Sequence, residues 1–114
     1  MFEKNMKFPI LLDTYGSLLS DRKREILDYY YNEDYSLAEI SELTGISRQG
    51  VRDSVKKSED ELFDLEKKLG LAQKNEHIQC AVQILNEIMS STSLDQNIKS
   101  QLDNVIVQLN GTNS

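Results

Sequence analysis

The sequence has few of the residues that most often build cross-linked, metal-binding or catalytic sites. Its 114 residues include one cysteine, one histidine, one proline and no tryptophan. A single cysteine, Cys80, excludes an internal disulfide and a multi-cysteine metal cluster. Because Cys80 falls in an apolar helical segment, we expect it to be a small buried hydrophobe.

The remaining polar residues form no recognisable catalytic pattern. No serine, cysteine or carboxylate arrangement around His77 suggests a catalytic triad or a metal site, so we expect this side chain at the surface. The sequence also lacks a glycine-rich loop that could cradle the phosphates of a nucleotide cofactor. These absences predict a protein that is not an enzyme and that holds neither a metal nor a cofactor.

Long apolar runs are missing as well. No segment approaches the roughly twenty consecutive apolar residues that a membrane-spanning helix needs. The N-terminus lacks the basic-then-apolar layout of a secretory signal. We therefore expect a cytoplasmic protein with no membrane contact.

Positive charge is in the minority, because 13 Lys and Arg residues stand against 19 Asp and Glu residues and give a net charge of −6. This balance argues against a protein that coats nucleic acid without sequence preference. Any surface that faces phosphate groups must therefore be local.

Helical periodicity is present in nearly every segment. Apolar residues recur at three- and four-residue spacing, and no run of β-branched residues alternates with polar ones. The sequence thus predicts an all-α fold, with helices over residues 8–19, 21–31, 37–44, 48–69, 78–89 and 94–109.

Residues 35–51 combine two helix starts with one tight turn. Ser36 and Glu39 have the spacing of a capping box, in which each side chain accepts a hydrogen bond from the other residue's backbone N–H. Gly45 can adopt the left-handed conformation that ends a helix. Ser47 follows as the cap of the next helix. This order of signals predicts a helix-turn-helix motif.

Two helices separated by three residues cannot continue as one rod, so they must cross steeply and bury a shared apolar set. In a helix-turn-helix, this crossing lays the second helix in a DNA major groove. The shared set is expected to comprise Leu37, Ile40, Leu43, Ile46, Val51 and Val55.

The second of these helices has no stop signal until Gly70 and carries an apolar seam. Two interpretations of the seam remain open: it packs against the C-terminal helices of the same chain, or it forms a coiled-coil-like contact with a second copy. The seam residues are Val51, Val55, Ser58, Leu62, Leu65 and Leu69.

Residues 70–75 are the expected hinge between two parts of the chain. The first part, residues 1–71, is the helix-turn-helix domain, with its long helix over about 48–69. The second part, residues 72–114, is expected to be a helical hairpin that packs on the first part or on a second subunit. Ser93 and Gln96 have the spacing of a second capping box, which would open the last helix.

The N-terminal half of the long helix concentrates positive charge. Four basic residues oppose one acidic residue, Asp53, between positions 47 and 58, which gives a local charge of about +3. The start of such a helix touches base edges, where Arg prefers guanine and Gln prefers adenine, while hydroxyls and helix N-termini hold phosphates. The residues expected to bind DNA are Ser36, Thr44, Ser47, Arg48, Gln49, Arg52, Lys56 and Lys57, with charge added by Arg22 and Arg24. The competing interpretation is that these charges form the solvated face of an ordinary amphipathic helix.

These segments carry a resemblance to known families. The segment Leu19–Leu27, followed by Ser36–Ile40 and Gly45–Val51, resembles the fourth region of bacterial sigma factors. The likeness is closer to the YlxM-like family of small helix-turn-helix proteins, which Tyr15–Leu19 and Leu65–Leu71 also resemble. Members of that family are small, all-helical, cytoplasmic bacterial proteins, often encoded beside the protein GTPase of the signal recognition particle. The resemblance implies a sigma-region-4-like fold, DNA binding by analogy, and a role in protein targeting by gene neighbourhood.

Three hypotheses follow. The first is a DNA-binding regulatory protein of the signal recognition particle pathway, acting as a homodimer through the long helix or the hairpin. The second is an accessory protein that binds the RNA or the GTPase of that particle directly. The third is a protein–protein adaptor without nucleic-acid binding. The acidic total favours the second and third hypotheses, and the charge on one helix favours the first.

Overall fold

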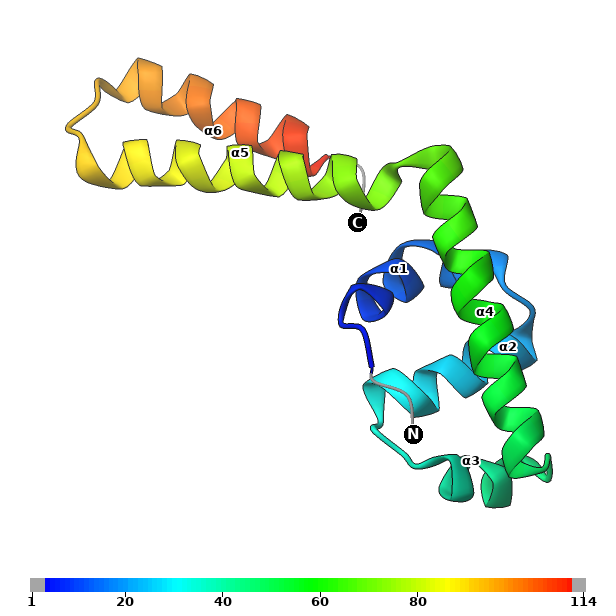
Figure 1. Cartoon of the computed structure of the whole chain (residues 1–114). Helices are drawn as coiled ribbons and strands as arrows, with labels where there is room; N and C mark the ends of the chain where they lie inside the picture. The colour runs from blue at the N-terminus through cyan, green and yellow to red at the C-terminus, as the bar shows by residue number, and fades with distance from the viewer. Residues whose placement is uncertain (1–3, 112–114) are drawn as a thin grey trace. The chain divides into compact units, whose positions relative to one another are not determined.

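The computed structural model describes residues 4–111 and contains six α-helices in that range (Figure 1). No residue of this range lies in a strand, so the predicted all-α class is confirmed. The chain divides into two compact units, one ending at Ala72 and the other beginning at Gln73. Within residues 4–111, no helix combines the length and the apolar character that crossing a membrane requires.

The first unit is organised around one long helix. Its helices are α1 (Lys7–Tyr15), α2 (Asp21–Leu27), α3 (Leu37–Thr44) and α4 (Arg48–Leu69), with a 3-10 turn after α1 and a π-helical turn after α2. The three shorter helices all pack on α4 (Figure 1). The core comprises Leu11, Leu12, Tyr15, Leu19, Ile26, Leu27, Tyr30, Ile40, Val51, Val55, Leu62 and Ala72.

The apolar seam of α4 is used inside this unit. Val51, Val55, Ser58 and Leu62 are fully buried, because α1, α2 and α3 supply apolar side chains at the matching three- and four-residue spacing. Both interpretations of the seam were therefore wrong: its partners are the three helices that precede it. Leu69, at the end of the seam, is 53% exposed.

The expected hinge at residues 70–75 contains the boundary between the two units, and Gly70 is the one residue that interrupts the helix there. Gly70 adopts a left-handed conformation with φ 63°, and α5 (Leu71–Ser91) begins at the next residue. The Tyr15 hydroxyl donates to Glu66 at 2.6 Å and accepts from the Leu71 N–H at 3.0 Å. Glu66 also accepts from the Ala72 N–H at 3.0 Å, so the first turn of α5 is tied to the core.

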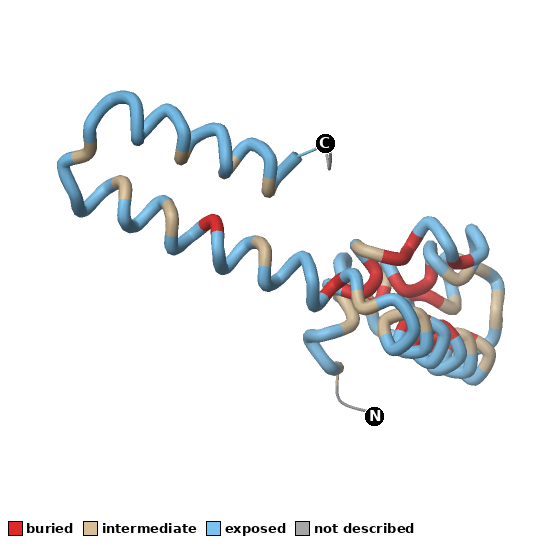
Figure 2. The backbone as a smooth tube through the Cα atoms, turned by 90° about the horizontal axis from the view of Figure 1, so that it is seen from above, coloured by how far each residue is buried: buried red, intermediate tan, exposed pale blue. Residues whose placement is uncertain are grey.

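The second unit is an antiparallel hairpin of α5 and α6 (Gln96–Asn110) (Figure 1). Within residues 73–111, Val82 is the one buried residue, and most of the hairpin is coloured as exposed in Figure 2. Cys80 is exposed, so its predicted burial was wrong: two helices alone cover only one stripe of each other. The capping box expected at Ser93 and Gln96 was also wrong, since Asp95 precedes the first turn of α6 and makes no side-chain cap bond.

Candidate nucleic-acid interface

The turn between α3 and α4 is held by the caps that the sequence predicted. The Ser36 hydroxyl accepts from the Glu39 N–H at 3.1 Å, and the Glu39 carboxylate accepts from the Ser36 N–H at 3.0 Å. The Ser36 N–H, and after it the Ser36 hydroxyl, favour the charged carboxylate and lower the pKa of Glu39. Gly45 ends α3 with φ 75°, a conformation that a Cβ would strain. The capping box and the glycine stop are therefore confirmed.

The first turn of α4 is packed closely against the residue before its cap. The Ser47 hydroxyl accepts from the Gly50 N–H at 3.0 Å, as predicted. A Cβ at position 50 would lie 2.6 Å from the Ile46 side chain, which explains glycine inside a helix. Tight packing at Gly50 fixes the crossing of the two helices.

The shared apolar set is confirmed except at one position. Ile40, Val51 and Val55 are fully buried, whereas Leu43 is 57% exposed. Leu43 lies in the last turn of α3, one residue before the helix ends at Thr44.

The basic residues of the recognition segment, defined here as residues 47–57, all reach solvent. Six of the predicted DNA-binding residues are exposed here and belong to the N-terminal half of α4 or to its cap: Ser47, Arg48, Gln49, Arg52, Lys56 and Lys57. The acidic Asp53 is exposed among them. The three-four spacing of the buried residues turns the helix so that these side chains lie away from the core. The structure thus brings six of the eight predicted DNA-binding residues onto one continuous helical surface.

Gln49 and Lys56 each lie close to an acidic residue on the same helix. The Gln49 amide nitrogen donates to Asp53 at 2.9 Å, and the Lys56 ammonium lies 3.8 Å from Asp60. Both contacts join residues four positions apart, a spacing that was visible in the sequence but was not used. Asp53 is therefore a residue of the interface that sequence reasoning missed.

The two predicted phosphate contacts on α3 are both hydrogen-bonded within the chain. Ser36 is exposed, and its hydroxyl accepts from the Glu39 N–H while it also stabilises the charged Glu39 carboxylate. Thr44 is half-buried and gives its proton to the Ile40 carbonyl at 2.8 Å. A phosphate contact by the Thr44 hydroxyl would require that bond to break.

The positive charge expected from Arg22 and Arg24 on α2 is neutralised by acidic residues of the same helix. Arg22 lies 3.5 Å from Glu25, and Arg24 lies 3.1 Å from Asp21. These pairs join residues three apart on α2, so neither guanidinium adds an isolated positive charge.

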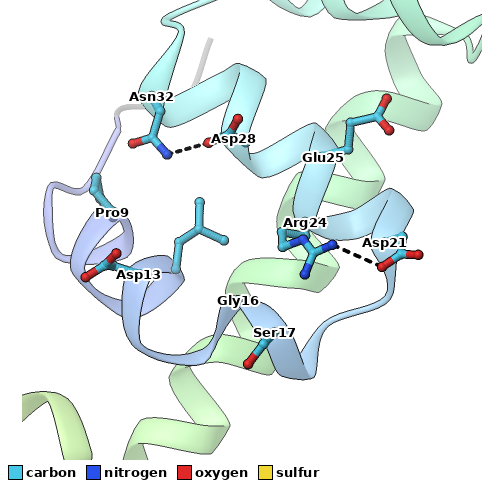
Figure 3. A pocket seen from close by; sticks show the side chains of 10 residues that line it. Pro9, Asp13, Gly16, Ser17, Asp21, Arg24, Glu25, Asp28 and Asn32 are labelled. Carbon is cyan, nitrogen blue, oxygen red and sulfur yellow. Dashed lines mark hydrogen bonds and ion pairs between the residues drawn. The ribbon is translucent and has the colours of Figure 1, made fainter. Parts of the chain in front are cut away.

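A second feature of this unit is a hollow of about 740 Å³ between α1, α2 and the turn that follows α2 (Figure 3). Asp13, Asp21, Glu25 and Asp28 are among its lining residues, with Arg24 as the one basic residue of the lining. Four carboxylates against one guanidinium repel phosphate groups. Sequence reasoning missed this hollow, because the acidic residues come from separate segments and share no motif.

Comparison with known proteins finds a family whose model matches most of this chain. The model of the family UPF0122, described as "Putative helix-turn-helix protein, YlxM / p13 like", matches residues 2–105. A UPF0122 protein of Clostridium novyi is 39% identical over 110 residues, which cover 96% of this chain and 95% of the relative. A UPF0122 protein of Caldanaerobacter subterraneus is 49% identical over 78 residues, which cover 68% and 67% of the two chains. A third, from Thermoanaerobacter, is 54% identical over 69 residues, which cover 60% and 59%.

Proposed function

This chain belongs to the UPF0122 family, and we propose that it is a DNA-binding regulatory protein whose recognition segment enters the major groove. The observation that carries the proposal is the exposed, positively charged start of α4, held in place by a capped turn. In a protein with a net charge of −6, a positive surface of this kind is local and attracts the duplex in one orientation.

The roles of the individual side chains follow from their chemistry. Arg48 and Arg52 present guanidinium groups that match the two acceptors of guanine, and Gln49 matches adenine. Lys56 and Lys57, further along the helix, are assigned to phosphates together with the N-terminus of α3 at Ser36. Phosphate contacts set the position of the protein, and the first turn of α4 reads the sequence.

We also propose that the protein acts as a cytoplasmic homodimer and regulates the signal recognition particle pathway. Paired half-sites about one DNA turn apart require two recognition helices, which a dimer provides. The link to protein targeting is supported by the resemblance to the YlxM-like family alone.

A titration of DNA selected from genomic fragments tests the function. Fluorescence anisotropy is measured for the wild type, for Arg48→Ala and Arg52→Ala, and for Lys67→Ala, an exposed control near the other end of α4. Each arginine variant should lose about 1 to 3 kcal/mol, roughly 5- to 150-fold in affinity, and Lys67→Ala should bind like the wild type. Equal binding by the wild type and both arginine variants would reject this helix as the reader.

A second candidate function is direct binding to a component of the signal recognition particle, or adaptor activity between proteins. The acidic hollow on α1 and α2 and the net charge of −6 favour it. Affinity purification from lysate with and without nuclease separates the candidates. Recovery of the particle GTPase after nuclease treatment supports direct protein binding. Recovery of the particle RNA supports binding to that RNA, and absence of both components removes this candidate.

A further inference from the structure

The hairpin of α5 and α6 has an apolar strip that its two helices leave uncovered. Ile84 and Ile88 on α5, and Ile98 and Val105 on α6, are between 44% and 57% exposed. We call these four residues the hairpin strip. The two helices face one another through a different set of buried or half-buried residues, which comprises Ile78, Val82, Leu85, Met89, Leu102, Ile106 and Leu109.

The hairpin strip lies on one broad side of the hairpin. On α5 the strip residues stand about a quarter to a third of a turn from the stripe that faces α6. On α6 they stand about an eighth to a fifth of a turn from the stripe that faces α5, in the same rotational sense. Because α5 and α6 are antiparallel, rotation in the same sense in both helices brings these residues to the same side. The Gln79 amide donates to Asn110 at 3.3 Å, which fixes the register and sets Ile84 level with Val105.

The strip side carries no charge along its apolar length. Between residues 81 and 88 and between residues 98 and 105, the helical positions on this side are filled by the strip itself, Ala81 and Gln101. The opposite side of the hairpin is polar: it carries Gln83, Asn86 and Asp103, with Val107 as its exposed apolar residue. The two sides of one hairpin thus differ in both charge and apolar content.

We propose that the hairpin strip binds the hairpin strip of a second copy of this chain, so that two hairpins form a four-helix bundle around a two-fold axis. A two-fold contact places a surface against itself, and an uncharged strip does so without repulsion between like charges. A strongly charged partner would find no complementary charge on this side. Pairing two strips also supplies the second apolar layer that a hairpin with one buried residue lacks.

This inference deepens the proposed function, because paired half-sites require two recognition helices. Its test nevertheless needs no DNA. A chain that dimerises through the strip but fails to bind DNA would remove the proposed function and leave the inference standing. Specific DNA binding by a monomer would do the reverse.

The experiment measures the mass of the full chain in solution by sedimentation equilibrium. The wild type is compared with Ile84→Glu and Val105→Glu, which charge the strip, and with Val107→Glu, a matched control on the opposite side that is 63% exposed. Circular dichroism verifies that each variant keeps its helix content. We expect twice the 13.1 kDa of one chain for the wild type and for Val107→Glu, and 13.1 kDa for the two strip variants.

Three outcomes would overturn the proposal: a monomeric wild type, dimers that survive both strip substitutions, or a dimer that Val107→Glu dissociates equally well. If a strip glutamate reduces helix content, Ile84→Gln gives the same readout, because glutamine is a strong helix former that adds no charge. Dissociation by Ile84→Gln supports the proposal, and a fully dimeric Ile84→Gln with intact helices contradicts it.

Discussion

The two units of this chain have the same secondary structure but differ in how much apolar surface they bury. In the first unit, three helices surround a fourth and twelve residues form a buried core. In the second unit, two helices lie side by side and Val82 alone is buried among residues 73–111. Amphipathic periodicity is enough to make helices in both units, but a core forms only where several helices enclose one another. The first unit therefore presents its candidate site on a packed support, whereas the second unit leaves much of its apolar surface exposed.

Shortening a core side chain gives the largest expected effect. Leu62→Ala in α4 removes a fully buried side chain and should lower the free energy of unfolding by about 2 to 5 kcal/mol. Leu102→Ala in α6 is the matched control, and it should cost less than half as much because Leu102 is only half-buried. Urea denaturation measures both, and equal losses would contradict the contrast between the units.

Ionisation of tyrosine at alkaline pH should act on the first unit alone, since all five tyrosines precede Ser36. Burial raises the pKa of Tyr15 above 10.0, with the hydrogen bond to Glu66 adding to it. Burial also raises the pKa values of Tyr30 and Tyr31, beside Glu59. The folded unit keeps these protons when the unfolded chain loses them, so stability is complete below pH 10 and falls above it.

Above pH 10, each tyrosine with a raised pKa should lower the free energy of unfolding by about 1.4 kcal/mol per pH unit. This loss should continue until the pH reaches the pKa that the tyrosine has in the folded chain. Denaturation at a series of alkaline pH values measures the slope, and Tyr15→Phe should reduce it. A Tyr15→Phe protein with the wild-type slope would argue against a raised pKa at this position.

Alanine substitution should distinguish Ser36 from Ser93, the two serines whose spacing in the sequence predicted a capping box. Ser36→Ala should cost about 1 kcal/mol, because the Glu39 N–H loses its acceptor. Ser93→Ala should change the stability by less than about 0.5 kcal/mol, since the structure forms no capping box there. Thermal unfolding checks both variants, and a larger loss for Ser93→Ala would restore the box that the sequence predicted.

The smallest effect is expected at Asp53, which accepts the hydrogen bond from the Gln49 amide. Asp53→Asn keeps an acceptor and removes the charge, whereas Asp53→Ala removes both. Both variants should bind DNA slightly more tightly, because a negative charge leaves the interface. Asp53→Asn should keep the adenine preference assigned to Gln49, and Asp53→Ala should weaken it by about 0.2 to 0.5 kcal/mol. Competition between single-base variants of the site measures this preference, and identical preferences in the two variants would exclude a positioning role.

Local signals explain how much of the fold could be predicted from the sequence. Ser36, Gly45 and Ser47 act within one helical turn, so their spacing was enough to place the ends of α3 and α4. Ser93 has the same spacing but forms no cap, because α6 begins after Asp95, two residues further along the chain. At Ser36 the preceding Tyr35 is anchored: its N–H donates to the Tyr29 carbonyl at 3.0 Å and the two rings stack.

Tertiary packing explains what could not be predicted. The seam of α4 showed that the helix needed a partner, but its spacing could not distinguish α1, α2 and α3 from a second copy or the C-terminal helices. The exposure of Cys80 likewise depends on how many helices surround α5. At the candidate site the sequence indicated the charges, whereas the neutralising pairs of Arg22 and Arg24 were readable from their spacing and were overlooked.

The most direct test of the central claim is amide chemical-shift mapping of the full chain by NMR during titration with the selected duplex. We predict that the shifted amides cluster at residues 47–57 and at the start of α3, while those of α6 stay in place. Shifts confined to the acidic hollow or to the hairpin would contradict the claim that the start of α4 is the surface that meets DNA.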